Sequence, residues 1–177
     1  MQERDRVALF ERMVTPHIGT AYSLARWLTR NDEDAEDVVQ EACVRAFRSL
    51  HGFRGADSRA WVLAIVRNTA YSWLQRNRRH EVTVPLDDRL DDACSDGNHP
   101  ELQVMREVDQ QALAKALDEL PLEFREVIIL REMEDLSYRE IASIAGLPIG
   151  TVMSRLARAR KRLQQRLTAE RELHCDL

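Results

Sequence analysis

The stretch LSYREIASIAGLPIGTVMSRLARARKRL, residues 136–163, contains the start and stop signals of a short helix, a turn and a second helix. Ser137 and Glu140 have the spacing of a capping box, in which each side chain bonds the other residue's backbone N–H. A helix is therefore predicted to begin at Tyr138 and to stop near Gly146, because glycine commonly ends helices.

A second helix is predicted after the turn, with Pro148 and Gly150 at its start. Its apolar residues recur at intervals of four, three, four and four, which predicts one buried stripe of Val152, Leu156, Ala159, Leu163 and Leu167. Two short helices with a glycine-containing turn, and cations on the outer face of the second, are typical of a DNA-reading helix-turn-helix. The alternative is a charged amphipathic helix that only packs in a bundle.

The outer face of this second helix supplies most of the candidate DNA contacts. Arg158 has the fork of donors that binds guanine edges in the major groove, and the small Ala157 permits close approach. Neighbouring polar and basic side chains are placed for base or phosphate contacts. The candidate set is Arg139, Thr151, Met153, Ser154, Arg155, Ala157, Arg158, Arg160 and Lys161.

The rest of the chain also reads as helix, because apolar residues recur every three or four positions and no sustained alternation indicates a strand. We therefore expect an all-α protein. The further predicted helices span 7–28 with an interruption at Pro16, 31–50, 58–79 with Ser58 as cap, 101–119, and 121–133 with Pro121 at its first position. Positions that recur at helical spacing are Leu9, Met13, Ile18, Tyr22, Ala25 and Leu28, then Val39, Ala42, Ala46 and Leu50, then Trp61, Ile65, Asn68 and Ser72.

Charge is segregated along the chain, although the net charge is only −4. Residues 59–79 contain five basic and no acidic side chains, and residues 149–167 contain six basic and none acidic. Residues 80–120 contain three basic side chains against eleven acidic ones. Two basic segments separated by an acidic one would contact a polyanion at two places. Two solvated helix faces are the alternative.

Residues 80–100, HEVTVPLDDRLDDACSDGNHP, have no helical period and contain two prolines, one glycine and six acidic residues. This composition is typical of a linker. We therefore expect two small helical domains, residues 1–80 and 109–177, joined by a flexible acidic linker over residues 81–108.

Other classes of protein have little support in the sequence. The five histidines lie in no recognisable catalytic motif and the three cysteines have no CxxC spacing, so we expect neither an enzyme nor a metal or cofactor site. A metal-sensing tail at His174 and Cys175 is a weak alternative. No apolar run approaches the roughly 18 residues of a membrane span and the N-terminus is charged, so we expect no membrane insertion and a cytoplasmic protein.

Three stretches together resemble the sigma-70 family of bacterial transcription initiation factors, in its small extracytoplasmic-function (ECF) group. LDELPLEFREVIILREMEDLSYREIASIAGLPIGTVMSRLARARKRL is similar to the family's region 4, whose helix-turn-helix reads the −35 promoter element. DAEDVVQEACVRAF and SRAWVLAIVRNTAYSWLQRNRR are similar to its region 2. The similarity covers roughly residues 8–79 and 109–167, in the family's order.

The resemblance implies that an acidic helix face binds the clamp helices of the polymerase β′ subunit, with Asp34, Asp37, Gln40 and Glu41 as the matching residues. Stabilisation of the helix dipole is the alternative role for these acids. The resemblance also implies that the basic helix grips and helps to open the −10 element. The candidate contacts there are Phe53, Arg54, Arg67, Asn68, Arg76, Arg78 and Arg79.

The partners implied by the resemblance are core RNA polymerase, through its β′ clamp helices and β flap, promoter DNA and an anti-sigma factor. Trp61 and Trp73 could stack on bases, but their apolar flanks favour the core. Ser72 and Met153 depart from the residues that the family often has, so promoter preference is not predicted at those contacts. A helix-turn-helix regulator with an unrelated N-terminal sensing domain is the rival interpretation.

Overall fold

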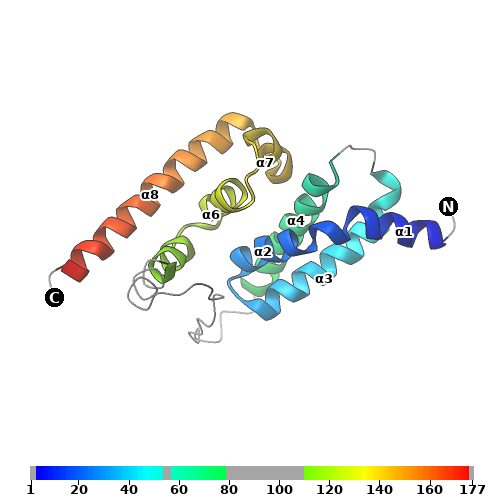
Figure 1. Ribbon diagram of the computed structural model, residues 1–177, viewed down its shortest axis with the longest axis horizontal. Helices are drawn as coiled ribbons and strands as arrows, with labels where there is room; N and C mark the ends of the chain where they lie inside the picture. Colours follow the sequence, from blue (N-terminus) through cyan, green and yellow to red (C-terminus); the bar gives the residue numbers. More distant parts are fainter. Residues whose placement is uncertain (1–2, 54–56, 79–109, 176–177) are drawn as a thin grey trace, which may run out of the picture.

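In a computed structural model of the chain, residues 3–53, 57–78 and 110–175 are described, with side chains for 4–53, 57–77 and 110–169. The elements within these ranges are all helical, which confirms the all-α prediction (Figure 1). The predicted linker over 81–108 lies outside the described residues.

The N-terminal half forms a bundle of helices. Its elements are α1 (Glu3–Met13), η1 (Thr15–His17), α2 (Ile18–Thr29), α3 (Asp32–Ser49), η2 (Leu50–Gly52) and α4 (Ser58–Arg78). Helices α2, α3 and α4 each pack on the other two, and α1 lies against α3 (Figure 1). The predicted interruption at Pro16 is confirmed, because the chain turns there through η1. This turn reorients α2, and Ile18 is consequently 38% exposed rather than part of the predicted apolar face.

The residues buried on α4 are not those noted for their helical spacing in the sequence. The residues buried on it are Val62, Leu63, Val66, Thr69 and Ala70. Asn68 is exposed, and Trp61 and Ile65 are only partly buried against the core. The reason is that α4 packs against α7 as well as against α2 and α3, and that long-range contact has no local sequence signal.

The start of α4 also differs by one residue from the prediction. The helix already includes Ser58, and the Asp57 carboxylate accepts the backbone N–H of Ala60 at 3.1 Å. Asp57 therefore has the capping role that was predicted for Ser58.

The C-terminal half begins with a helix over residues 110–118. It continues with α6 (Leu122–Ile128), the π-helical turn η4 (Ile129–Met133), α7 (Tyr138–Ala145) and α8 (Ile149–Cys175). Pro121 is the N-cap of α6 rather than its first helical residue, because its ψ of 141° is extended. Helix α8 runs beyond Leu167, where the predicted stripe ends, and lies along the edge of the molecule away from α1 (Figure 1).

The predicted helix-turn-helix is confirmed at α7 and α8. The Ser137 hydroxyl accepts the Glu140 N–H at 3.3 Å, and the Glu140 carboxylate accepts the Ser137 N–H at 2.7 Å, which completes the capping box. Gly146 ends α7 with a φ of 67°. The first three residues of the predicted α8 stripe are buried, namely Val152, Leu156 and Ala159.

The two halves share one continuous apolar core. Helix α6 packs on α2, and α7 packs on α4 (Figure 1). Buried residues of α6, such as Phe124 and Val127, belong to the same cluster as Leu24 of α2 and Val66 of α4. The predicted basic helix α4 is therefore covered along part of its length by the predicted region 4.

The left-handed backbone at Gly146 provides a test of the turn between α7 and α8. We expect Gly146→Ala to lower the free energy of unfolding by about 1–2 kcal/mol, because a side chain is strained at positive φ. A Cβ would meet nothing within 4 Å at this position, so the cost is a backbone effect.

The matched control is Gly150→Ala in the first turn of α8, where a Cβ also meets nothing within 4 Å and φ is not positive. We expect that variant to be neutral or slightly stabilising, by about 0.5 kcal/mol. Urea unfolding followed by circular dichroism measures both. Equal stability changes in the two variants would contradict the left-handed cap.

Candidate nucleic-acid interface

The outer face of α8 carries cations that are available to a polyanion. Arg158 and Lys161 are exposed and form no ion pair with any described residue. Ala157 and Ser154 are also exposed, and the Ser154 hydroxyl donates to the Thr151 carbonyl at 3.0 Å. The structure therefore places the centre of the predicted DNA-reading face in solvent.

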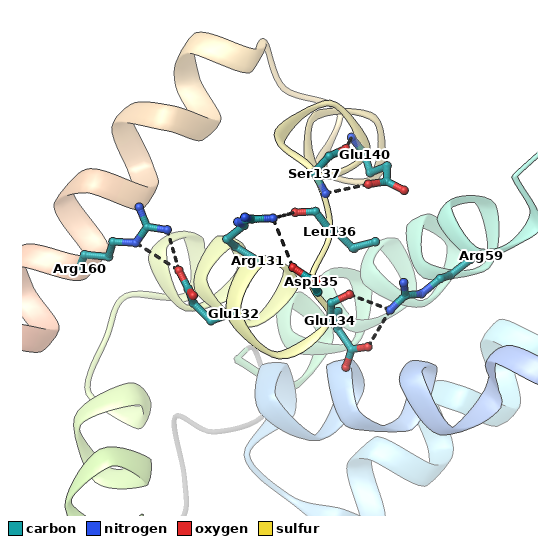
Figure 2. Close-up of polar contacts among 9 residues, drawn as sticks. All are labelled: Arg59, Arg131, Glu132, Glu134, Asp135, Leu136, Ser137, Glu140 and Arg160. Atoms are coloured by element: carbon teal, nitrogen blue, oxygen red, sulfur yellow. Dashed lines mark hydrogen bonds and ion pairs between the residues drawn. The ribbon is translucent and has the colours of Figure 1, made fainter.

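Two other predicted contacts on α8 are already paired with carboxylates. Arg155 lies 3.3 Å from the Glu123 carboxylate of α6. Arg160 donates to the Glu132 carboxylate at 2.6 Å, and this hydrogen bond raises the pKa of the guanidinium (Figure 2). These two arginines would bind a phosphate only by exchanging one anion for another.

Met153 and Arg139 complete the predicted −35 set, and both are exposed. Met153 is 53% exposed on the first turns of α8, and Arg139 lies on α7. Thr151 is half-buried. All nine predicted −35 contacts therefore lie on the two helices of the helix-turn-helix, as the sequence predicts.

The entry to the helix-turn-helix is fixed by Arg131 of η4. Its guanidinium donates to the Leu136 carbonyl at 2.9 Å and lies 3.6 Å from the Asp135 carboxylate (Figure 2). Asp135 has a φ of 49°, a conformation that aspartate tolerates better than most residues. These contacts hold the turn before α7 and so set the angle at which the helix-turn-helix leaves η4.

Arg67, a predicted −10 contact, faces protein. Its Nε donates to the fully buried Glu126 carboxylate at 2.5 Å, and the Tyr71 hydroxyl donates to the same carboxylate at 2.7 Å. Burial opposes the charge of Arg67, but its hydrogen bond with Glu126 and the charge of that residue give a net rise of its pKa. The Arg67 side chain is only 17% exposed and is not presented to solvent as a DNA contact would be.

Arg76, another predicted −10 contact, is exposed and turns toward α3. It donates to the Glu41 carboxylate at 2.8 Å and lies over the Trp73 ring at 5.6 Å. Glu41 also pairs with Arg45, and hydrogen bonds from Arg76 first and then Arg45 lower the pKa of Glu41. One residue predicted to bind DNA is thus paired with one predicted to bind polymerase.

The remaining −10 candidates are scattered. Asn68 is exposed, and its side-chain oxygen accepts from Arg67 at 3.1 Å. Phe53 is half-buried and packs on Trp61 with ring centroids 4.8 Å apart. Arg54, Arg79 and the side chain of Arg78 lie outside the described residues. Among the described −10 candidates, Arg67 and Arg76 therefore pair with carboxylates, and Phe53 packs on another ring.

The acidic face of α3 is open to solvent at its centre. Asp37 and Gln40 are exposed, whereas Asp34 is half-buried, with its N–H donating to the Asn31 side chain in the first turn. Asp34 therefore fits the alternative role in the helix dipole better than Asp37 does.

Sequence reasoning missed two functional candidates, Arg125 and Glu126. Both are buried, at 3% and 0% exposure, within an otherwise apolar run of α6 and η4. The sequence did contain a signal for them, the run FREVIIL, in which an adjacent arginine and glutamate interrupt an apolar segment. Because such a segment is expected to be buried, its two charged residues are expected to be buried and paired.

No described group of three or more His, Cys, Asp or Glu side chains is arranged to hold a metal ion. In the same described portion of the chain, every helix is too short or too polar to cross a membrane.

The chain matches two family models in succession. Residues 13–80 match sigma-70 region 2, and residues 110–163 match sigma-70 region 4. The chain is 35% identical to RNA polymerase sigma factor SigV of Bacillus subtilis, over 92% of this chain and 93% of that protein. It is 34% identical to ECF RNA polymerase sigma factor SigE of Mycolicibacterium smegmatis over 89% of this chain, but spans only 61% of that relative.

Two solved structures have a similar fold. The sigma factor RpoE of Bartonella quintana, in complex with the anti-sigma factor NepR, has a TM-score of 0.74 and 31% identity, covering 90% of this chain and 96% of RpoE. CnrH, in complex with the cytosolic domain of CnrY, has a TM-score of 0.61 and 26% identity, covering 90% of this chain and 88% of CnrH. Together with the ordered family matches, these similarities show that the chain belongs to the sigma-70 family of RNA polymerase sigma factors, in its extracytoplasmic-function group.

Proposed function

We propose that this chain binds core RNA polymerase and directs it to a subset of promoters. In this proposal residues 1–80 act as region 2, residues 81–108 as the linker and residues 109–177 as region 4. The observation that carries the proposal is the ordered pair of family matches along one chain, at 13–80 and 110–163. The exposed cations of α8 support it, because they lie where a helix-turn-helix contacts DNA.

In this proposal the free energy of binding drives promoter selection and strand separation, and the chain carries out no covalent step. Phosphate contacts give affinity without sequence information, while Arg158 selects sequence through base edges in the major groove. The −10 candidates of α4 would hold the strands as they separate. We place the protein in the cytoplasm, where the polymerase acts.

Asp37 and Gln40 are the proposed polymerase contacts that need no rearrangement, since both are exposed on α3. Glu41 would have to exchange Arg45 and Arg76 for a polymerase cation. An anti-sigma factor is a further proposed partner, because in the similar solved structures the sigma factor RpoE is bound by an anti-sigma factor and CnrH is bound by the cytosolic domain of CnrY.

In vitro transcription tests the proposed function against a helix-turn-helix regulator. The reaction contains purified core polymerase, this chain and fragments of the host genome. A sigma factor starts RNA at defined sites only when both proteins are present. A regulator would instead bind duplex DNA alone and leave core polymerase unable to start.

We expect Arg158→Ala to reduce discrimination among −35 sequences by about 1–3 kcal/mol, because one bidentate base contact is lost. Competition binding of the holoenzyme to a library of −35 variants measures this effect. The matched control is Arg162→Ala on the same helix, whose guanidinium lies over the Phe124 ring at 4.9 Å. An unchanged preference profile for Arg158→Ala, or an equal change for the control, would remove Arg158 from the base-reading set.

We expect Asp37→Lys to weaken binding of core polymerase about tenfold or more, because a cation replaces an exposed anion in the proposed contact. Titration of labelled chain with core polymerase measures the affinity. Glu11→Lys is the matched control, since it makes the same charge change at an exposed carboxylate on a different helix, α1. Equal losses for the two variants would indicate a general effect of charge.

A further inference from the structure

Two large apolar side chains are exposed at the start of α8, the second helix of the helix-turn-helix. Met153 is 53% exposed, and Ile149, the first residue of the helix, is 42% exposed. Single exposed apolar residues are common on protein surfaces. Among the large apolar side chains that are exposed in the described residues, however, only these two stand four positions apart in one helix. They lie on one face, because residues i and i+4 of a helix are neighbours.

The pair belongs to a row of apolar residues along α8. Positions 149, 153 and 157 follow one another at intervals of four, and Ala157 is exposed as well. The next row around the helix contains Gly150, Ser154 and Arg158, which are all exposed. The apolar row therefore borders the residues that the helix presents to solvent for reading DNA.

The charge around this row favours a polyanion as the ligand. Residues 149–167 contain six basic and no acidic side chains. Arg158 and Lys161 are exposed and form no ion pair with any described residue. Phosphates bound by these cations would hold the outer face of α8 in the major groove, where a second helix of this kind reads base edges. The apolar row would then meet base edges too.

Thymine is the base whose major-groove edge suits an apolar side chain. It presents a C5-methyl group there, whereas guanine, adenine and cytosine present hydrogen-bond donors and acceptors. The side chains of Ile149 and Met153 have no hydrogen-bond donor. A polar base edge against them would lose its water without gaining a partner, which costs free energy. A thymine methyl group would instead gain by leaving water.

We propose that Ile149 and Met153 form an apolar site for thymine methyl groups and thereby select A·T base pairs at fixed positions of the −35 element. The small Ala157 leaves room for the groove edge beside them. Arg158 reads its base through hydrogen bonds, whereas this site reads its bases through burial of a methyl group. The inference rests on the proposed function, because promoter DNA is the ligand.

Replacement of thymine by uracil tests the site, because uracil differs from thymine only in lacking the C5-methyl group. Holoenzyme formed from core polymerase and the full-length chain competes for two libraries of duplex −35 variants, one with thymine and one with uracil in its place. We expect the thymine library to show a preference for A·T at one or two positions. In the uracil library this preference should fall about fourfold at each such position, as burial of one methyl group predicts.

Substitutions at the two exposed positions assign the effect to the side chains. With Met153→Ala, uracil should no longer weaken binding at one of the positions, and Ile149→Ala should have this effect at the other. Met153→Leu keeps an apolar side chain and should keep the preference. The matched control is Met133→Ala, at a methionine that is 47% exposed at the end of η4 rather than on α8. We expect the control to show the full difference between the libraries.

Salt dependence separates a methyl contact from a phosphate contact. We expect Met153→Ala to leave the slope of log K against log salt concentration unchanged, because burial of a methyl group releases no counterions. Met153→Arg should steepen the slope by about 0.9, as one added phosphate contact predicts, and should abolish the difference between thymine and uracil at its position. A shallower slope for Met153→Ala would contradict the proposed chemistry.

Equal binding of the two libraries by the wild-type holoenzyme would overturn the inference. A uracil effect that persists in both Ile149→Ala and Met153→Ala would also overturn it, because the effect would then come from the DNA itself. Weaker binding of core polymerase by Met153→Ala, with an unchanged thymine preference, would assign the pair to a protein partner. In each of these cases a holoenzyme that starts RNA at promoters leaves the proposed function intact. A mixture that starts no RNA overturns the proposed function, and this inference with it.

Discussion

The buried carboxylate of Glu126 sets how the two halves of this protein lie against each other. Apolar contacts supply the area of the shared core, but they are non-directional and would tolerate a shift of α6 along α4. A buried charge without a partner costs several kcal/mol, so it tolerates no such shift. Only one register brings Glu126 to both Arg67 and Tyr71. The polar group gives the interface its specificity, and the apolar residues around it give affinity.

The elements that sequence reasoning predicted well are those with local causes. The capping box of Ser137 and Glu140 and the left-handed glycine at 146 act within a few residues, and the helix-turn-helix followed from them. The sequence analysis did not predict which face of α4 is buried, and part of that face packs on α7, which lies far away in the sequence. Helix α4 starts at Ser58 rather than after it, because the preceding residue, Asp57, caps the helix instead.

The candidate site shows the same division. Arg158 and Lys161 were predicted to face solvent and do so, because their position follows from the period of their own helix. Arg67 was predicted as a DNA contact from the family resemblance, but its carboxylate partner is 59 positions away. The partner of Arg76, Glu41, is 35 positions away. Periodicity identifies the helix face on which a side chain lies. Whether that side chain is already paired depends on the other elements that pack against the face.

Whether an arginine is already paired determines how much free energy it would gain by binding a phosphate. A surface cation such as Arg158, which forms no ion pair within the described residues, would gain the full attraction of a phosphate on DNA, with the release of counterions. An arginine already bound to a carboxylate gains only the difference between phosphate and carboxylate, and leaves the carboxylate to be solvated. Arg155 and Arg160 can make that exchange at the surface, where Glu123 and Glu132 remain in water. Arg67 cannot, because Glu126 is fully buried and reaches water only when α6 leaves α4. The proposed −35 contacts are therefore accessible in this arrangement, whereas the proposed −10 contact Arg67 becomes accessible only when α6 separates from α4.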